Sequence, residues 1–254
     1  MSSTGGSTLI HRSKDHKDSE GLAYNQRGTG GNVNEHGSMQ CYKNSESFIP
    51  VGWEWVVFST IILVRFCAAF SNSISDCDET FNYWEPTHFL LFGKGHQTWE
   101  YDSSFALRSY LYLLVHAFPG HLYNMVFKTN RIFIFYLTKF ILALISSFSE
   151  LYFCQSVARE LGTNAGRLTL AFLVLSAGMF ISSTAFLPSS TSMFLLMLSH
   201  GAWFNQSYAP AIFLTALSAF LSWPFAALLG TPIMLDVVLR KRKVGILFEN
   251  NNFV

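Results

Sequence analysis

Long apolar runs separated by short polar segments occupy most of this chain after residue 50. Trp53 to Phe70 is the first run, with Arg65 near its end, and Ile132 to Val157 is the second. A third run, Leu168 to Leu187, carries no charge at all. A helix of about 18 to 20 apolar residues is long enough to cross the hydrocarbon core of a bilayer. The pattern therefore predicts three membrane-spanning helices.

Three further apolar segments are less regular. Phe105 to Phe127 is interrupted by Pro119 and Gly120, which favours a pair of helices lying in the membrane interface. Thr191 to Phe204 is short for a span. Ala209 to Leu239 is long, but it contains proline and glycine breaks, so one kinked helix and a tight helical pair are both open.

Charge asymmetry predicts how these segments are oriented. The basic cluster from Arg240 to Lys243 is expected in the cytosol by the positive-inside tendency, on the same side as the N-terminal tail. An even number of crossings is then needed. We count five spans when the less regular segments are included, so a short sixth crossing at Pro232 to Leu239 would supply the even number. Residues 71–130 become the first luminal loop, while the sequon Asn205-Gln206-Ser207 lies in the cytosol without a glycan.

Composition sets the class of protein and its division into domains. The chain is 50% hydrophobic and only 13% charged, which is typical of an all-α, multi-pass membrane protein. Its net charge of +1 gives no indication of a nucleic-acid partner. Residues 1–50 are rich in Ser, Gly and Asn without apolar periodicity, so we expect a disordered cytosolic tail. Residues 51–243 form the expected membrane domain, and 244–254 an atypical C-terminal tail.

Acidic and aromatic residues gather directly after the first apolar run. Asp76, Asp78 and Glu79 follow it so closely that they must lie where a helix meets water, since carboxylates are costly in mid-bilayer. Tyr83 and Trp84 come next, with rings that suit an interface and can also stack on a sugar. We interpret this segment as an active-site loop at the membrane surface.

A short surface helix is expected within the same loop. Pro86 is suited to the first turn of a helix, and Gly93 can end it, so the prediction is a helix from Pro86 to Phe92. His88 lies on this helix, three residues after Glu85.

Several interpretations of the loop remain open. One carboxylate can act as a general base on a sugar hydroxyl while its neighbours position the substrates. Asp76-Cys77-Asp78 also fits the Asp-x-Asp pattern that binds a metal in nucleotide-sugar glycosyltransferases, although no βαβ alternation accompanies it. The acids can instead simply solvate a helix end. A transporter would be expected to use mid-span charges, for which Lys139 and Glu150 are the candidates, but an edge position or a packed pair explains these as well.

The chain resembles glycosyltransferase family 22. The strings that carry the resemblance are Ser75 to Gly93, Gln97-Thr98-Trp99-Glu100-Tyr101, Arg108-Ser109-Tyr110, Ala171 to Ser176, and Ala185 to Ser190. The resemblance covers about residues 53–240. It implies a multi-pass protein of GT-C fold in the endoplasmic reticulum membrane. The implied reaction is α-1,2-mannosyl transfer from dolichyl-phosphate-mannose to a lipid-linked oligosaccharide for protein N-glycosylation. The resemblance implies that the reaction takes place at the lipid membrane and inverts the anomeric carbon of the donor. It implies no cofactor and no metal.

The resemblance assigns the family's acidic pair to two residues of this loop. They are Asp78 and Glu79, and we expect Asp78 to be the base because its shorter side chain is more rigidly placed. Asp76 would help to position substrate. Trp84 is a candidate sugar platform, with an interfacial ring as the alternative.

Three further residues have candidate roles toward substrate. Glu85 and His88 could contact acceptor hydroxyls, although an ordinary surface pair is the simpler interpretation. Arg108 could bind the leaving phosphate, or it could be a snorkelling anchor at the interface. Family members are considerably longer than this chain, so a truncated, catalytically inactive short form is a second hypothesis.

Overall fold

The computed structural model describes residues 54–74, 76–127 and 130–240, and in this part of the chain the regular elements are all helices, without a strand. The tails expected at 1–50 and 244–254 and the basic residues 241–243 lie outside it. The elements are α1 (Glu54–Ser71), α2 (Cys77–Glu79), η1 (Thr80–Trp84), α3 (Glu85–Phe92), η2 (Trp99–Tyr101), α4 (Leu111–Phe127), α5 (Arg131–Leu161), α6 (Thr163–Leu175), α7 (Ala177–Ser182), α8 (Pro188–Phe204), α9 (Tyr208–Leu221), η3 (Pro224–Gly230) and a final helix over 231–240.

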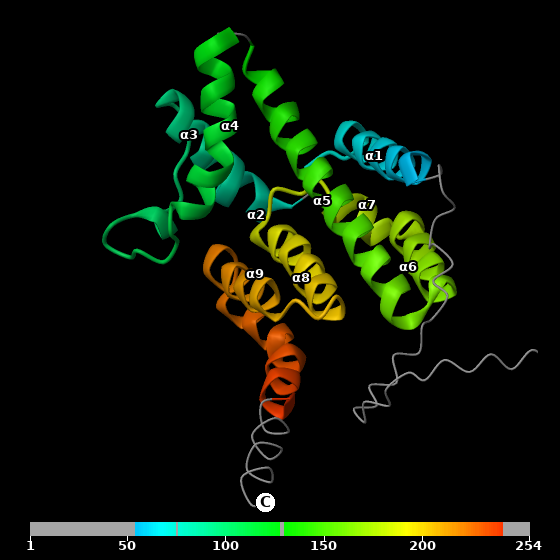
Figure 1. Ribbon diagram of the computed structural model, residues 1–254. Coiled ribbons are helices and arrows are strands. Elements are labelled where there is room, and N and C mark those ends of the chain that lie inside the picture. Colours follow the sequence, from blue (N-terminus) through cyan, green and yellow to red (C-terminus); the bar gives the residue numbers. More distant parts are fainter. Residues whose placement is uncertain (1–53, 75, 128–129, 241–254) are drawn as a thin grey trace, which may run out of the picture. The chain divides into compact units, whose positions relative to one another are not determined.

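The helix α5 is the element around which the others pack, because α1, α4, α6 and α8 all contact it (Figure 1). It begins where the Asn130 side chain accepts a hydrogen bond from the amide of Ile132, and it ends at Gly162, whose φ of 102° few other residues adopt. Among the helices described, it alone is long and apolar enough to cross a bilayer. The predicted span at 132–157 therefore lies within the single helix α5.

The first predicted span is also a single helix, since α1 covers all but its first residue. Its apolar part is shorter than that of α5. The third prediction was wrong: the run from Leu168 to Leu187 is not one helix. It breaks at Ser176, whose extended backbone ends α6 and whose side chain caps α7 by accepting from the amide of Met179.

Two other expectations about the helices need correction. The segment after Phe105 forms one helix, α4, which runs through Pro119 without ending, and not a pair of helices. The long segment that starts at Ala209 is a helical pair, as one alternative held. It turns at Ser222 and Trp223, and the chain is then helical from Pro224 through Gly230 to residue 240.

Close packing holds the segment after Trp223 against α9. A Cβ added at Gly230 would lie 2.4 Å from Cγ2 of Thr215 in α9, so the two segments approach where only a hydrogen atom fits. A small buried cluster joins this pair to α8, and its members are Ala202, Ala211 and Ile233.

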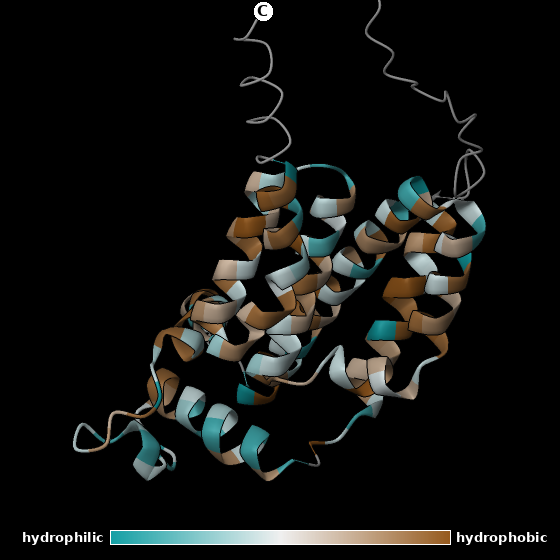
Figure 2. Ribbon diagram, turned by 90° about the horizontal axis from the view of Figure 1, so that it is seen from below, coloured by the Kyte–Doolittle hydropathy of each residue, from teal (hydrophilic) through white to brown (hydrophobic). Residues whose placement is uncertain are grey.

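Apolar side chains cover much of the outside of these helices, whereas many buried positions are polar. Phe148, Leu175 and Phe220 are exposed on α5, α6 and α9, and Figure 2 shows strongly hydrophobic residues along the helices. Serines 146, 147 and 149 of α5 are completely buried. Small polar residues between helices with apolar residues outside are typical of helices packed in lipid.

Buried polar side chains connect α1 to its neighbours. The Lys139 ammonium donates to the carbonyl of Asn72, 2.5 Å away, and the Asn72 amide donates to the carbonyl of Phe180 at the end of α7. Glu150 pairs with Arg65 of α1. Lys139 and Glu150 are therefore not partners of each other, and each holds α5 to α1 or to the residue that follows it.

Candidate active site

The acidic loop folds into one continuous helical stretch from Cys77 to Phe92. Asp76 begins it by accepting a hydrogen bond from the amide of Asp78, 2.9 Å away. Its middle part, η1, is π-helical, a variant that is often found at functional sites. The end at Gly93, in the left-handed conformation with φ of 67°, confirms the predicted short helix within one residue.

The two candidate acids face opposite environments. Glu79 is only 6% exposed, whereas Asp78 is exposed. Oε1 of Glu79 accepts from the Trp84 indole at 3.0 Å and from the amide of Phe186 at 2.9 Å. Glu79 therefore ties the loop to the chain before α8, and Asp78 is left at the surface.

Asp78 has one side-chain partner in the described structure. Its Oδ1 accepts from Nδ2 of Asn82, 3.1 Å away and one helical turn later. Asn82 is held in turn, because its backbone carbonyl accepts a hydrogen bond from the Tyr101 hydroxyl at 2.7 Å. A buried amide thus orients an exposed carboxylate, which is the arrangement a positioned general base requires.

Arg108 lies beside Tyr83, the residue that follows Asn82. Its guanidinium donates to the Tyr83 hydroxyl and, at 2.5 Å, to Glu100. Burial raises the pKa of Tyr83, while the positive charge of Arg108 opposes this. Burial alone would lower the pKa of Arg108, but the hydrogen bond to Glu100 and the charge interactions with Tyr83 and Glu100 together outweigh it, so its pKa lies above the usual value.

Arg108 lines a cavity of about 240 Å³ at this position. Tyr83 and Tyr112 line it from the loop side, and Ser222 and Trp223 line it from the turn after α9. The guanidinium also lies 5.9 Å from the centre of the Trp223 ring. Sequence reasoning did not connect residues 222–223 to the acidic loop, because over one hundred positions separate them along the chain.

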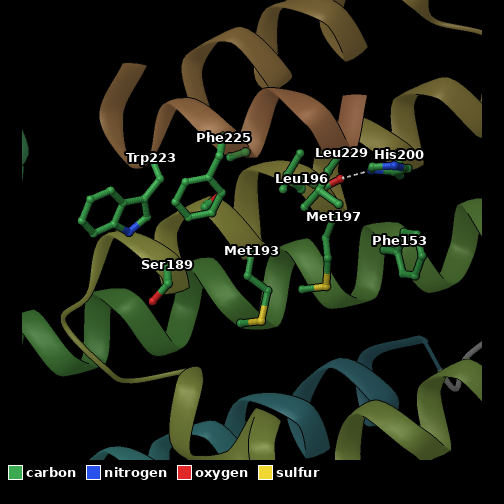
Figure 3. Close-up of a pocket in the computed structure, with 11 residues that line it drawn as sticks. Phe153, Ser189, Met193, Leu196, Met197, His200, Trp223, Phe225 and Leu229 are labelled. Carbon is green, nitrogen blue, oxygen red and sulfur yellow. Dashed lines mark hydrogen bonds between the residues drawn. The ribbon is translucent and has the colours of Figure 1, made fainter. Parts of the chain in front are cut away.

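Trp223 also lines a larger, apolar cavity of about 450 Å³ between α8, α5 and η3. Figure 3 shows Met193, Met197 and Phe225 around it. His200 is a polar member of the lining, and its Nδ1 is bonded to the carbonyl of Leu196, 2.8 Å away. The cavity of Arg108 and this apolar cavity therefore have Trp223 in common.

The other predicted site residues hold the loop together. Trp84 is partly buried, and its ring packs on Phe135 and Phe186, with centroids 4.6 and 4.9 Å away. Glu85 accepts from the amide of His96 at 3.2 Å, and His88 bonds the Lys94 carbonyl at 2.6 Å. In the part of the chain that the structure describes, no three His, Cys, Asp or Glu side chains gather as for a metal ion.

Comparison with known proteins identifies similar sequences. Residues 56–251 match the model of the Alg9-like mannosyltransferase family. The chain is 48% identical over 186 residues to "Alpha-1,2-mannosyltransferase ALG9" of Mus musculus and 49% identical over 185 residues to "Alpha-1,2-mannosyltransferase Alg9" of Drosophila melanogaster. The protein of the same description from Saccharomyces cerevisiae is 30% identical over 181 residues.

These matches cover different shares of the two partners. They take in 73% of this chain but only 30% of the mouse and fly proteins, and 68% and 32% for the yeast protein. The matched segment thus spans less than a third of the length of these three relatives. No solved structure gives a significant match.

Proposed function

The chain belongs to the Alg9-like mannosyltransferase family, and on this basis we propose that it serves α-1,2-mannosyl transfer in lipid-linked oligosaccharide assembly for protein N-glycosylation. The donor is dolichyl-phosphate-mannose and the acceptor a dolichol-diphosphate-linked oligosaccharide in the lumen of the endoplasmic reticulum. The observation that carries the proposal is the exposed Asp78 carboxylate, which the Asn82 side chain orients. The next residue, Tyr83, contacts Arg108.

In the proposed reaction Asp78 acts as general base. It takes the proton from an acceptor hydroxyl, whose oxygen forms a bond to the anomeric carbon of the donor mannose. The bond from that carbon to the phosphate oxygen breaks, and dolichyl phosphate leaves with the electron pair. One displacement of this kind inverts the anomeric centre. Glu79 holds the loop beside Asp78 in place, because its carboxylate accepts from the partly buried Trp84 indole and from the buried amide of Phe186.

Arg108 is suited to the leaving phosphate. A guanidinium is always charged and presents planar donors to phosphate oxygens. Glu100 and Tyr83 hold it at the rim of its cavity. The adjoining apolar cavity, which shares Trp223 with it, offers a surface for the first part of the donor's prenyl chain. The charged and apolar ends of one donor would then lie on the two sides of this ring.

The remaining site residues are assigned supporting roles. Asp76 sets the start of the helix that carries Asp78. Trp84 is engaged through both its ring and its indole N–H, so we assign it to holding Glu79 and not to stacking on sugar. Glu85 and His88 keep a proposed role toward the acceptor.

The proposal also covers the membrane arrangement. We propose a GT-C type, multi-pass membrane domain over residues 51–243, with 71–130 on the luminal side. This is supported by the apolar outer surface of the helices and by the length and composition of α5. A catalytically inactive short form is the second candidate, and the transfer measurement below separates the two.

Mannosyl transfer in membranes that express this chain tests the proposal. Radiolabelled dolichyl-phosphate-mannose and a truncated lipid-linked oligosaccharide are supplied to the native chain, to Asp78→Asn and to Asp102→Asn. Asp102 is the matched control, an exposed loop aspartate whose carboxylate accepts from the amide of Ser104.

The three outcomes separate the candidates. Transfer that is lost in Asp78→Asn and kept in Asp102→Asn supports Asp78 as the base. Transfer kept in both variants refutes that assignment. Absence of transfer by the native chain supports the inactive short form.

A further inference from the structure

Arg108 is held at its cavity by an acidic partner from the same loop. Nε of Arg108 donates to the Glu100 carboxylate at 2.5 Å, and the two side chains are 19% and 22% exposed. The main-chain amide of Arg108 also donates to the carbonyl of Glu100, 3.2 Å away. Between them lies Ala106, whose φ of 44° is left-handed. Backbone and side chain together therefore fix Glu100 beside the cation.

One nitrogen of this guanidinium remains for a ligand. Glu100 accepts from Nε and the Tyr83 hydroxyl accepts from Nη1. Nη2 has no hydrogen-bond partner in the described part of the chain, and it is not among the fully enclosed polar atoms there. Nε and Nη2 lie on the same edge of a guanidinium, as the contact of both with Glu150 shows for Arg65. A phosphate oxygen bound at Nη2 of Arg108 would therefore lie next to the Glu100 carboxylate.

The charges around this cavity are not those of a simple cationic site. The charges of Arg108, Asp78 and Glu100 all act on the phenol of Tyr83, which lines the cavity. Two of these three side chains are negative and one is positive. A second negative charge on a bound phosphate is attracted by the guanidinium but repelled by both carboxylates, so it adds little to binding. Removal of the Glu100 charge would make the second phosphate charge favourable.

The charge of the phosphate changes during the proposed reaction. The donor phosphate is a diester and carries one negative charge. When its bond to the anomeric carbon breaks, it becomes a monoester, which carries about −1.5 to −2 charges at neutral pH. A site that favours the additional charge would bind the product more tightly than the donor and would slow product release.

We propose that Glu100 sets the charge selectivity of the Arg108 cavity, so that the site accepts the phosphodiester of a prenyl donor without retaining the phosphomonoester that leaves. The identity of the lipid rests on the proposed mannosyl transfer, while the charge balance stands on Arg108, Glu100 and Asp78 themselves. Glu100 acts through the guanidinium and through its own charge, and it takes no part in bond making. It is a specificity residue to which the sequence assigned no role.

Binding without turnover tests this selectivity separately from the transfer reaction. The probes are citronellyl phosphate, a short prenyl phosphomonoester, and its methyl ester, a phosphodiester with the same prenyl chain. Isothermal titration calorimetry measures the affinity of each probe for the purified full chain in detergent at neutral pH. The readout is the ratio of the two affinities, monoester over diester. We expect the native chain to bind the monoester no more tightly than the diester.

Variants then assign the selectivity to one residue. Glu100→Gln keeps an oxygen that can accept from Nε of Arg108 and removes the charge, so the ratio should rise about tenfold in favour of the monoester. Asp102→Asn is the matched control, because it removes the same charge from the same loop at a carboxylate that accepts from the amide of Ser104, and its ratio should equal the native one. Arg108→Gln should lose the binding of both probes. Thermal unfolding of each variant verifies folding.

Several results would overturn the inference. Absence of binding of both probes to the native chain would remove the site, and binding that persists in folded Arg108→Gln would place it elsewhere. An unchanged ratio in folded Glu100→Gln would exclude the role of Glu100. An equal rise in Asp102→Asn would make the effect one of overall charge. Inorganic phosphate that binds as tightly as citronellyl phosphate would exclude a prenyl ligand.

The outcome is separable from that of the transfer measurement. A chain that transfers no mannose but shows the expected change of ratio would contradict the proposed function and leave the charge selectivity in place. Transfer together with an unchanged ratio would contradict the selectivity alone.

Discussion

Arg65 and Glu150 are 85 positions apart in the sequence and form a two-pronged ion pair between α1 and α5. Nε of Arg65 lies 2.8 Å from Oε1 of Glu150, and Nη2 lies 2.7 Å from Oε2. Both side chains are 0% exposed. Nη2 also donates to the carbonyl of Leu173 near the end of α6, and Ser146 donates to Glu150. One buried pair therefore holds three helices.

Loss of one partner of this pair should be strongly destabilising. We expect Arg65→Ala or Glu150→Ala to lower the free energy of unfolding by about 3–5 kcal/mol, because each leaves an uncompensated buried charge. The double variant Arg65→Met, Glu150→Leu should be less destabilised than either single one. Thermal unfolding in detergent measures the three effects, and additive losses would contradict the coupling.

Glu79 should prove more important for stability than for proton transfer. Glu79→Ala leaves the amide of Phe186 and the Trp84 indole without their acceptor, so we expect a loss of about 3 kcal/mol. Glu79→Gln keeps an oxygen for both donors and should lose much less stability. Chemical unfolding checks the pair. If Gln is as destabilising as Ala, the charge and not the acceptor is what stabilises the loop.

Tyr83 and Tyr101 should titrate late in alkali. Burial raises the pKa of both phenols above the ordinary value of 10.0. The folded state thus favours the neutral phenols, so their contribution to stability is constant below that pH and falls as the pH rises above it. Ultraviolet titration of tyrosinate should lose a late step in Tyr83→Phe. Loss of a step at the ordinary pH instead would show that Tyr83 is not buried in solution.

The sequon at Asn205 should carry no glycan. Its amide nitrogen donates to the Tyr152 hydroxyl at 3.2 Å and to Oγ of Ser156 at 2.9 Å, so the atom that would be glycosylated is engaged within the helices. The proposed topology also places it in the cytosol. Endoglycosidase treatment should leave the electrophoretic mobility unchanged. A mobility shift that disappears in Ser207→Ala would contradict both arguments.

Gly201 should tolerate no larger side chain, because α8 approaches α5 at this residue. A Cβ added there would lie 2.7 Å from Cε1 of Tyr152, whereas at Gly178 in α7 the nearest atom is 3.6 Å away. We expect Gly201→Ala to cost about 1–3 kcal/mol of unfolding free energy. Gly178→Ala is the matched control and should be neutral or slightly stabilising. Equal unfolding midpoints for the two variants would contradict close packing at Gly201.

Local patterns predicted several elements correctly. The apolar runs gave α1 and α5, and the Pro86 and Gly93 signals gave α3, because helix periodicity and capping depend on neighbours within a few residues. The same patterns failed at Ser176, where an uninterrupted apolar run hides a break. Apolar character alone does not specify whether the backbone continues as one helix.

The sequence by itself determined that this chain is helical, that its acids follow the first apolar helix, and that its motifs are those of one family. Only the tertiary structure decided which acid is exposed, since Glu79 is removed from solvent by the amide of Phe186, 107 positions away. It likewise brought Arg108 to Trp223. Propensity acts between neighbours, whereas burial and pairing depend on contacts between helices, which no short window of sequence contains.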